Sequence, residues 1–322
     1  LLFDLRRQSN GTLADQNCPA QNQRLIADFH YIMEDPGFFP IRKLAIVGLG
    51  LIGGSLAIDL RRLGLAAEIL GYDSNPEHCT KAKELHLADH CNFVPDETLR
   101  DADWIVFAVP VQSTEKALEQ FRPFLKPDIL ITDTGSVKTP LQQIMLRSEN
   151  AGYAFVGGHP IAGGERFGPE AAVESLFAGK RFVLTPNEQT RKAPLEAVRR
   201  LWTEIGCEVI EMDAHLHDRI FASVSHLPHL LAYATIQAIA DSDSPEALEH
   251  SGAGLKDFSR IASSSPEMWA DIFLQNQQPL LQRVEALSTC IHQIGEAIRQ
   301  NDKQRLVELL AQAKASKDRW VQ

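Results

Sequence analysis

Long apolar runs, paired cysteines and an excess of basic residues are all missing from this sequence. No run approaches the roughly 18 apolar residues that a membrane helix needs, so we expect no membrane association. The formal net charge is -10, and because no basic cluster is present we expect no nucleic-acid partner. The N-terminal segment also lacks the apolar core of a secretory signal.

The five cysteines are scattered and form no Cys-x-x-Cys pair. They are Cys18, Cys79, Cys91, Cys207 and Cys290. An odd, unpaired set favours a reducing, cytoplasmic compartment and argues against both a disulfide framework and a structural zinc site. His86, His90 and Cys91 have polar surroundings and no further ligand nearby, so we interpret them as surface residues and predict no metal site.

The composition itself is that of an ordinary globular protein. The chain has 322 residues, of which 44% are hydrophobic and 23% charged, which suggests about two domains with packed cores. Residues 1–40 are rich in Gln, Asn, Asp and Arg, and we expect a loosely ordered N-terminal extension there. Pro36, Gly37 and Pro40 separate this extension from the first predicted strand.

A glycine-rich loop follows the predicted strand 44–47. Residues 48–53 read G-x-G-x-x-G, and a helical pattern begins directly after them. In such a loop the first Gly makes a tight turn, the second admits a pyrophosphate, and the third lets helix and strand pack closely. A second strand, 68–72, ends in Asp73, which can accept hydrogen bonds from both ribose hydroxyls. This order predicts dinucleotide binding, and Asp73 favours NAD over NADP because it would repel a 2′-phosphate.

Strands and helical patterns alternate over residues 41–212. Further strands are expected at 104–110, 129–133, 155–157, 181–185 and 208–211. This alternation predicts an α/β domain built on a doubly wound, mostly parallel sheet. Ligands bind such sheets at the carboxyl ends of the strands, so the residues that follow the strands should line one crevice. The predicted cofactor contacts are Gly48, Gly50, Leu51, Ile52, Gly53, Asp73, Val109 and Pro110.

Only helical patterns follow Asp213. We predict a long apolar helix at 217–240 that is interrupted by Pro228, then helices at 254–261, 266–299 and 302–320. Apolar stripes at helical spacing are usually core. A helical domain as small as 213–322 often shares its core with a second copy, so we predict a dimerisation and substrate domain and a homodimer.

One histidine lies in a glycine-rich stretch near the middle of the chain. His159 stands between Gly158 and Pro160, and we expect it in the loop after strand 155–157. Pro fixes the backbone behind the histidine, and Gly lets a ligand approach the main chain closely. The stretch is therefore either the position of a general base or a simple turn, and by itself it does not decide between them.

Polar residues interrupt two of the later helical segments. His226 and His229 each need a partner, because burying an unpaired polar group costs about 1–3 kcal/mol. Both are either core histidines bonded to backbone carbonyls or ligand contacts, and no third metal ligand stands beside them. Arg260 is either half of a salt bridge, for example to Asp257, or a bidentate clamp for a carboxylate.

Taken together, these stretches resemble the prephenate/arogenate (cyclohexadienyl) dehydrogenase family. The resemblance covers about residues 41–322, and its motifs appear in the family's order. They are VGLGLIGGS at 47–55, TDTGSVK at 132–138, GHPIAG at 158–163, SHLPH at 225–229, KDFSRIA at 256–262 and PEMW at 266–269. The first motif is generic for dinucleotide binding, and the later ones are specific to the family.

The resemblance implies an NAD-dependent oxidative decarboxylation of prephenate to 4-hydroxyphenylpyruvate, a step of tyrosine biosynthesis. It implies that His159 contacts the ring hydroxyl and accepts its proton, while Ser136 hydrogen-bonds both that hydroxyl and His159. Positioning of the C–H bond against the nicotinamide is the main task, and an imidazole suits proton transfer near neutral pH.

Further substrate contacts are implied in the same way. Arg260 would grip a substrate carboxylate, His229 would hold the side chain, and Trp269 would shape the pocket. Glu165 and Asp257 would join Arg260 in an ionic network at the mouth, within one subunit or across the dimer. One departure is Gly164, which stands where many relatives carry a hydroxyl residue, so one polar contact to the substrate is missing or replaced by water.

Other functions stay open at this point. Arogenate, or both substrates, would be used if the pocket holds an acidic partner for the amine. A β-hydroxyacid dehydrogenase would need a catalytic Lys on the first long helix of the second domain, and residues 223–240 contain none. A catalytically silent NAD-binding sensor would bind cofactor without producing NADH. Because the chain ends at Gln322, we expect no regulatory domain after the last helix.

Overall fold

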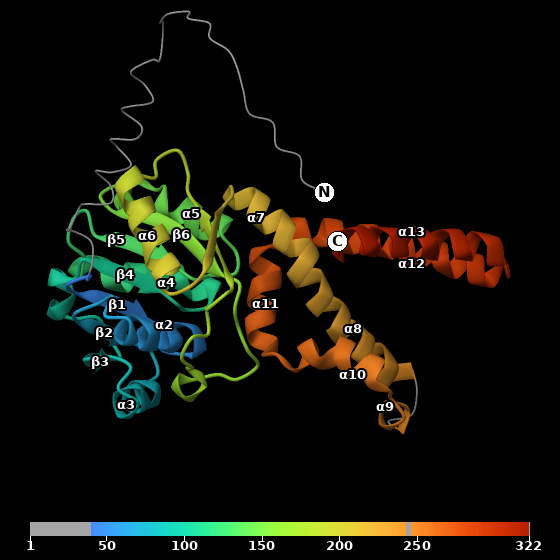
Figure 1. Ribbon diagram of the computed structural model, residues 1–322, viewed down its shortest axis with the longest axis horizontal. Helices are drawn as coiled ribbons and strands as arrows, with labels where there is room; N and C mark the ends of the chain where they lie inside the picture. Colours follow the sequence, from blue (N-terminus) through green and yellow to red (C-terminus); the bar gives the residue numbers. More distant parts are fainter. Residues whose placement is uncertain (1–39, 243–245, 322) are drawn as a thin grey trace, which may run out of the picture. The chain divides into compact units, whose positions relative to one another are not determined.

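A computed structural model describes residues 40–242 and 246–321 of the chain, so most of the expected N-terminal extension lies outside the described residues. Two kinds of architecture follow each other along this range (Figure 1). An eight-stranded sheet with helices comes first, and helices alone follow. Within the described residues, none of the helices combines the length and the apolar character needed to cross a bilayer.

The sheet has the strand order β3-β2-β1-β4-β5-β6-β7-β8. All neighbouring strands run parallel except β6 and β7, which pair antiparallel. The predicted doubly wound, mostly parallel sheet is therefore confirmed. The strands are β1 Leu44–Val47, β2 Ile69–Tyr72, β3 His90–Asn92, β4 Trp104–Phe107, β5 Leu130–Asp133, β6 Ala154–Pro160, β7 Arg181–Thr185 and β8 Glu208–Glu211.

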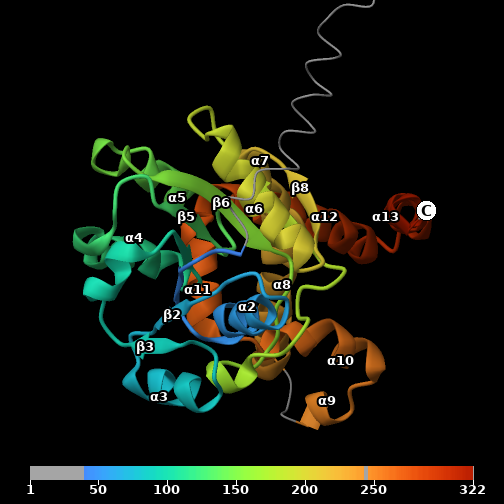
Figure 2. The ribbon, with the colours of Figure 1, turned by 60° about the vertical axis from the view of Figure 1, so that its left-hand side comes forward.

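The two ribbon views show helices on both faces of this sheet (Figure 1, Figure 2). Strands covered on both faces are mostly apolar, and every residue of β1, β2, β4 and β5 is buried, including the polar Thr132 and Asp133 at the end of β5. The helices of this part are α2 Leu51–Arg62, α3 Pro76–Glu84, α4 Val111–Phe121, α5 Thr139–Met145 and α6 Lys192–Glu204. A buried cluster that includes Phe107, Leu118 and Ile131 packs α4 and α5 against the sheet.

The helical part begins at α7, where Asp213 caps the helix by accepting a hydrogen bond from the N–H of Leu216 at 3.0 Å. The helices of this part are α7 Ala214–Phe221, α8 Leu227–Ser242, α9 Glu246–Glu249, α10 Ala253–Ser259, α11 Pro266–Gln275, α12 Gln277–Arg299 and α13 Lys303–Val321. An apolar cluster of Val137, Trp269 and Ile272 joins the two parts, with α11 packed against α4.

The predicted break at Pro228 lies earlier than we expected. Residues Ala222–His226 form a π-helical turn between α7 and α8. Pro228 has no N–H to donate, and its ring would collide with the carbonyl of Val224 in a regular helix. The wider π-helical turn before the proline relieves that conflict. The regular helix is therefore interrupted over the turn that precedes Pro228, and not at Pro228 itself.

Three other element predictions were also wrong. The predicted helix 266–299 is two helices, because Asn276 leaves the helical conformation at φ -111° and donates hydrogen bonds from its side chain. Cys91 is buried in the short strand β3 instead of lying on the surface. His159 lies within β6 and not in a loop, because β6 continues to Pro160 by pairing with β7.

Candidate active site

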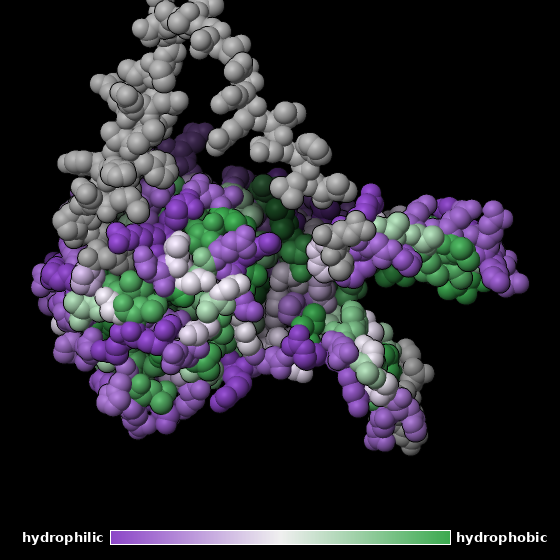
Figure 3. All heavy atoms as spheres, in the orientation of Figure 1, coloured by the Kyte–Doolittle hydropathy of each residue, from purple (hydrophilic) through white to green (hydrophobic). Residues whose placement is uncertain are grey.

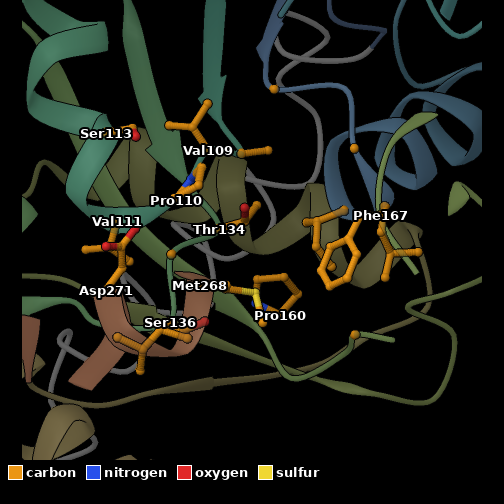
Figure 4. Close-up of a pocket in the computed structure, with 18 of the residues that line it drawn as sticks. Val109, Pro110, Val111, Ser113, Thr134, Ser136, Pro160, Phe167, Met268 and Asp271 are labelled. Atoms are coloured by element: carbon orange, nitrogen blue, oxygen red, sulfur yellow. The ribbon is translucent and has the colours of Figure 1, made fainter. Parts of the chain in front are cut away.

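A cavity of about 1010 Å³ lies between the carboxyl ends of the sheet strands and the helical part. Its lining contains all the predicted site residues except Gly53 and Asp257. The predicted residues that line the cavity from the sheet part are Gly48, Gly50, Leu51, Ile52, Asp73, Val109, Pro110, Ser136, His159 and Glu165. Those from the helical part are His229, Arg260 and Trp269. Figure 4 shows Pro110, Ser136 and Pro160 around this cavity with Met268 of α11.

The glycines of the 48–53 loop are required by close backbone contacts. Gly48 has φ +95°, and a Cβ there would lie 2.4 Å from the carbonyl oxygen of Ala108. A Cβ on Gly53 would lie 1.9 Å from the carbonyl oxygen of Gly48, which explains why this residue packs behind the loop and does not line the cavity. Beside Gly50 nothing lies within 4 Å of a built Cβ, so this position leaves room for a ligand.

The start of α2 has the character of an anion site. Gly50 provides no side-chain cap, and no acidic residue occurs in the first turn, so the N–H groups and the positive end of the helix dipole face the cavity. Asp73, at the end of β2, accepts from the N–H of Leu49 and of Asn75, each at 3.0 Å, which holds its carboxylate fixed. A pyrophosphate beside Gly50 and a ribose beside Asp73 fit these residues, so this end of the cavity suits NAD.

His159 is held on strand β6 by its register with β7. His159 lies opposite Val183, and Pro160 lies opposite Phe182. A Cβ on the preceding residue, Gly158, would lie 2.3 Å from the ring of Phe182. This glycine therefore permits the Phe182 side chain of β7 to pack closely against β6. The histidine is therefore aimed by a paired strand, not by a flexible loop.

The polar partner of His159 is a second histidine. Nδ1 of His159 lies 2.8 Å from Nε2 of His217, and Nδ1 of His217 lies 2.8 Å from Oδ1 of Asp218. Among the described residues no hydrogen bond joins Ser136 to His159. Ser136 lies in the loop between β5 and α5 and lines the same cavity.

The environment of His159 favours the neutral imidazole. Burial lowers the pKa of His159 well below 6.5, and the nearby His217, Lys138 and His226 lower it further. The ring also packs edge-on against Phe221, with 5.0 Å between the ring centroids. A neutral imidazole that lines a cavity has a lone pair for accepting a proton.

At the helical side, Arg260 forms an ion pair with Glu165 at 2.8 Å. Both side chains are largely exposed, at 67% and 43%, so the pair can open without uncovering a buried charge. Asp257 lies exposed on α10 and outside the cavity lining, and the structure shows no ion pair between it and Arg260. Within the described residues of this one chain, the Glu165–Arg260 contact is the part of the expected ionic network that is present.

His229 and Trp269, also in the helical part, form a stacked pair. Their ring centroids are 3.6 Å apart. Nδ1 of His229 lies 2.9 Å from the carbonyl oxygen of Ser225. Because that carbonyl can only accept, Nδ1 carries the proton and Nε2 keeps a lone pair. Burial lowers the pKa of His229, which agrees with a neutral ring.

Three buried residues near His159 were not predicted from the sequence: His217, Asp218 and Lys138. Lys138 is buried, and its Nζ contacts Asp133 and lies 2.6 Å from the carbonyl oxygen of Gly158. One signal was available in α7, where His217 and Asp218 share a helix face with Ala214 and Phe221 at spacings of three and four. Among the described residues, no cluster of three or more His, Cys, Asp or Glu could hold a metal ion.

Two family models match the chain in sequence order. The model of the prephenate dehydrogenase nucleotide-binding domain matches residues 56–211, and that of the prephenate dehydrogenase dimerization domain matches residues 213–312. Prephenate dehydrogenase of Bacillus subtilis is 32% identical over 278 residues, which cover 85% of this chain and 75% of that protein. Cyclohexadienyl dehydrogenase of Zymomonas mobilis is 31% identical over 270 residues, which cover 83% and 92%.

Solved structures show the same relationship. Prephenate dehydrogenase of Aquifex aeolicus, crystallised with hydroxyphenyl propionate and NAD+, is 36% identical with a TM-score of 0.79 over 87% of this chain and 98% of that chain. Arogenate dehydrogenase of Synechocystis is 32% identical with a TM-score of 0.71 over 86% and 99%. With its glycine loop, crevice histidine and helical second part, the chain belongs to the prephenate dehydrogenase family.

Proposed function

We propose that this chain is an NAD-dependent prephenate dehydrogenase that converts prephenate to 4-hydroxyphenylpyruvate and CO2 in tyrosine biosynthesis. The observation that carries the proposal is the position of His159 on the wall of one cavity that also contains the glycine loop and Arg260. A hydride acceptor, a proton acceptor and a carboxylate clamp are the three groups that this reaction requires, and the family membership supports the same assignment.

The residues of the sheet part would bind the cofactor. Gly48, Gly50 and the start of α2 would hold the pyrophosphate, and Asp73 would accept from the adenosine ribose. Gly53 would keep α2 close to the loop, and Val109 and Pro110 would lie beside the nicotinamide ribose. When bound, NAD+ supplies the site that takes up the hydride.

His159 would act first as a proton acceptor and then as a donor. The ring hydroxyl gives its proton to Nε2 of His159 while hydride leaves the same carbon, and a C=O bond forms. Loss of CO2 then makes the ring aromatic and returns the electron pair to that oxygen. The product carries a phenol O–H, so His159 can return the proton, and the overall equation releases none.

Residues of the helical part would hold the rest of the substrate. Arg260 would exchange its Glu165 contact for a substrate carboxylate, because a bidentate guanidinium–carboxylate pair is stronger than one exposed contact. Nε2 of His229 would accept a hydrogen bond from the substrate or a bound water, and Trp269 holds that imidazole by stacking. Ser136 would donate to the ring hydroxyl oxygen, and Asp257 would influence the mouth only from outside the cavity.

Arogenate is the second candidate substrate. Its amine needs an acidic partner, and two carboxylates of the lining, Glu165 and Asp271, could accept from it. NADH formation at 340 nm with prephenate and arogenate side by side separates the two. Turnover of either substrate would also exclude a silent NAD-binding sensor, whereas cofactor binding without NADH production would favour that function.

His159→Asn tests the proposed base. We expect kcat to fall by roughly 10²- to 10⁴-fold, the usual contribution of a general base. In the wild type the rate should fall as pH drops through the pKa of His159, which burial places below 6.5. The exposed His215 of α7 gives a control, His215→Asn, which should keep normal turnover. Near-full turnover of His159→Asn would contradict the assignment.

We also propose that the chain works as a cytoplasmic homodimer. Exposed apolar residues on α12 and α13, among them Ile291 and Val307, support pairing through the helical part, and the matching family model is described as a dimerization domain. The free thiols of Cys79, Cys91 and Cys207 support a reducing compartment.

A further inference from the structure

His159 is the first member of a line of three side chains that continues away from the cavity. The two contacts of this line, His159 Nδ1 to His217 Nε2 and His217 Nδ1 to Asp218 Oδ1, are both 2.8 Å long. His217 and Asp218 are buried, at 0% and 3% exposure, and neither lines the cavity. Their direct hydrogen-bonded connection to the cavity is His159, while His217 also stacks on the lining residue Phe221 with 4.3 Å between ring centroids.

Asp218 is fixed by the backbone at the start of α5. Its Oδ1 accepts from the N–H of Lys138 and its Oδ2 from the N–H of Thr139, each at 2.9 Å. Burial alone would raise the pKa of Asp218, but the hydrogen bonds from His217, Thr139 and Lys138 outweigh it and lower the pKa. Asp218 is thus a carboxylate at neutral pH, and it only accepts hydrogen bonds.

The donor and acceptor roles along the line follow from that carboxylate. Because Asp218 only accepts, Nδ1 of His217 must carry a proton. Burial lowers the pKa of His217, so its ring is neutral and Nε2 has a lone pair. That lone pair requires a proton on Nδ1 of His159, since two lone pairs would not approach to 2.8 Å. The remaining nitrogen of His159, Nε2, is then unprotonated.

We propose that His217 and Asp218 are positioning residues that fix His159 in the tautomer whose Nε2 can accept the substrate proton. This inference rests on the proposed role of His159 as the base. A neutral imidazole otherwise exchanges between two tautomers, and the one with a proton on Nε2 cannot act as a base at that nitrogen. The line of hydrogen bonds removes that inactive form.

The same line stabilises the charge that forms during the reaction. When the O–H bond of the substrate breaks and an N–H bond forms at Nε2, His159 becomes an imidazolium and the electron pair stays with the substrate oxygen. Its Nδ1–H still donates to His217, whose own Nδ1–H points at Asp218. Besides Asp218, the titratable groups near His159 and His217 are Lys138, Asp133 and His226. Of the two carboxylates, Asp133 and Asp218, only Asp218 hydrogen-bonds to the line.

Asp218→Asn tests the inference with little change of shape. An amide nitrogen turned toward His217 would donate to its Nδ1, which would reverse both histidines and put the proton on Nε2 of His159. The same nitrogen would face the N–H of Lys138, so thermal melts must accompany the kinetics of this variant. We expect kcat with prephenate to fall by about 10²-fold, within the range of general-base catalysis, while KM for NAD+ stays within about twofold. The acid limb of the pH–rate profile should move to lower pH, because the imidazolium loses its carboxylate.

Two substitutions of His217 form a matched pair. In His217→Gln the side-chain oxygen can accept from Nδ1 of His159 and keep the active tautomer, whereas His217→Leu removes the acceptor altogether. We expect the Leu variant to lose clearly more kcat than the Gln variant. Both variants can be compared with His215→Asn on the same helix, and thermal melts with NAD+ titrations report whether each protein is folded.

A double-mutant cycle separates positioning from structural damage. Asp218→Asn should lower kcat strongly in the wild type and hardly at all in His159→Asn, because the line then has no base to orient. An equal loss in both backgrounds, or an unmoved acid limb, would overturn the inference while leaving the proposed function intact. If His159→Asn itself keeps full turnover, the proposed base fails and the positioning role fails with it.

Discussion

A buried ion pair joins the two segments that carry the predicted base and Ser136. Nζ of Lys138 contacts Oδ2 of Asp133 and lies 2.6 Å from the carbonyl oxygen of Gly158. Oδ1 of Asp133 accepts from the N–H of Gly158 at 3.0 Å, so the contact between β5 and β6 is made by charge as well as by strand pairing. Both side chains are almost fully buried, at 1% and 3% exposure.

Replacing one partner of this pair should be costly. Lys138→Met leaves the Asp133 carboxylate buried without its counter-charge, and we expect the free energy of unfolding to fall by about 3–5 kcal/mol. Urea titration followed by circular dichroism measures this. Lys192→Met, at an exposed position at the start of α6, is the control and should change stability by less than about 0.5 kcal/mol. A similar small change for Lys138→Met would show that the pair contributes little.

At the residue scale the sequence predicted the conformation of the glycine loop better than the hydrogen-bond partner of His159. The glycines at 48 and 53 and Asp73 have roles fixed by local geometry, which a motif expresses directly. The partner of His159 was predicted to be Ser136, and the structure shows His217 instead. That contact joins residues 58 positions apart and arises only when α7 packs beside β6, which local spacing cannot reveal.

The π-helical turn between α7 and α8 places a histidine in the core of the helical part. His226 is 1% exposed, and its Nδ1 accepts from the side chain of Asn276 at 3.0 Å. Asn276 also donates to the carbonyl oxygen of Asp218 at 2.8 Å, so one amide joins the turn, α7 and the break between α11 and α12. Burial lowers the pKa of His226 to about 4. Asp218 raises this pKa, and His217 and His229 lower it.

This histidine should make stability depend on pH. In the unfolded chain His226 protonates below about 6.5, whereas in the folded protein it stays neutral down to about 4. The contribution of His226 to the free energy of unfolding is therefore complete above pH 6.5 and is lost as pH falls towards 4. The loss amounts to up to about 3 kcal/mol. Unfolding at several pH values should show a shallower slope for His226→Asn, which keeps an acceptor for Asn276. An unchanged slope would assign the pH dependence to other groups.

At the element scale, periodicity predicted most strands and helices but not their interruptions. Apolar runs identified β1 and β7 with their observed ends, since burial is visible in composition. The ends of β8 were also predicted correctly, although its residues are only partly buried or exposed. The π-helical turn forms because Pro228 has no N–H to donate. The break at Asn276 forms because the Asn276 side chain makes tertiary hydrogen bonds. Strand β3 is only three residues long, too short to show a pattern.

On the scale of the whole molecule, the hairpin of α12 and α13 is apolar where the single chain leaves it uncovered. Figure 3 shows hydrophobic residues along this hairpin. Ile291 is 57% exposed, Ile298 62% and Val307 55%. An exposed stripe of this kind is unusual for a monomer and typical of a surface that a second copy covers.

Charges on that stripe should dissociate the proposed dimer. We expect the wild type to sediment as a dimer at micromolar concentration and Ile298→Glu to sediment as a monomer, because a buried unpaired carboxylate opposes association. Glu308→Gln, at a charged position of α13, serves as the control. A wild type that sediments as a monomer over the same range would contradict the proposed dimer.

Strand β6 changes partners along its length, and this has a consequence for turnover. Up to Val156 it pairs with β5 in parallel, and from Gly157 to Pro160 it pairs with β7 in the opposite direction. We therefore expect the N–H of His159 to exchange hydrogen with solvent when the sheet opens, and not when nearby loops move. Nucleotide and product would then enter and leave while the imidazole of the proposed base keeps its direction, so each catalytic cycle would begin with that base already in place.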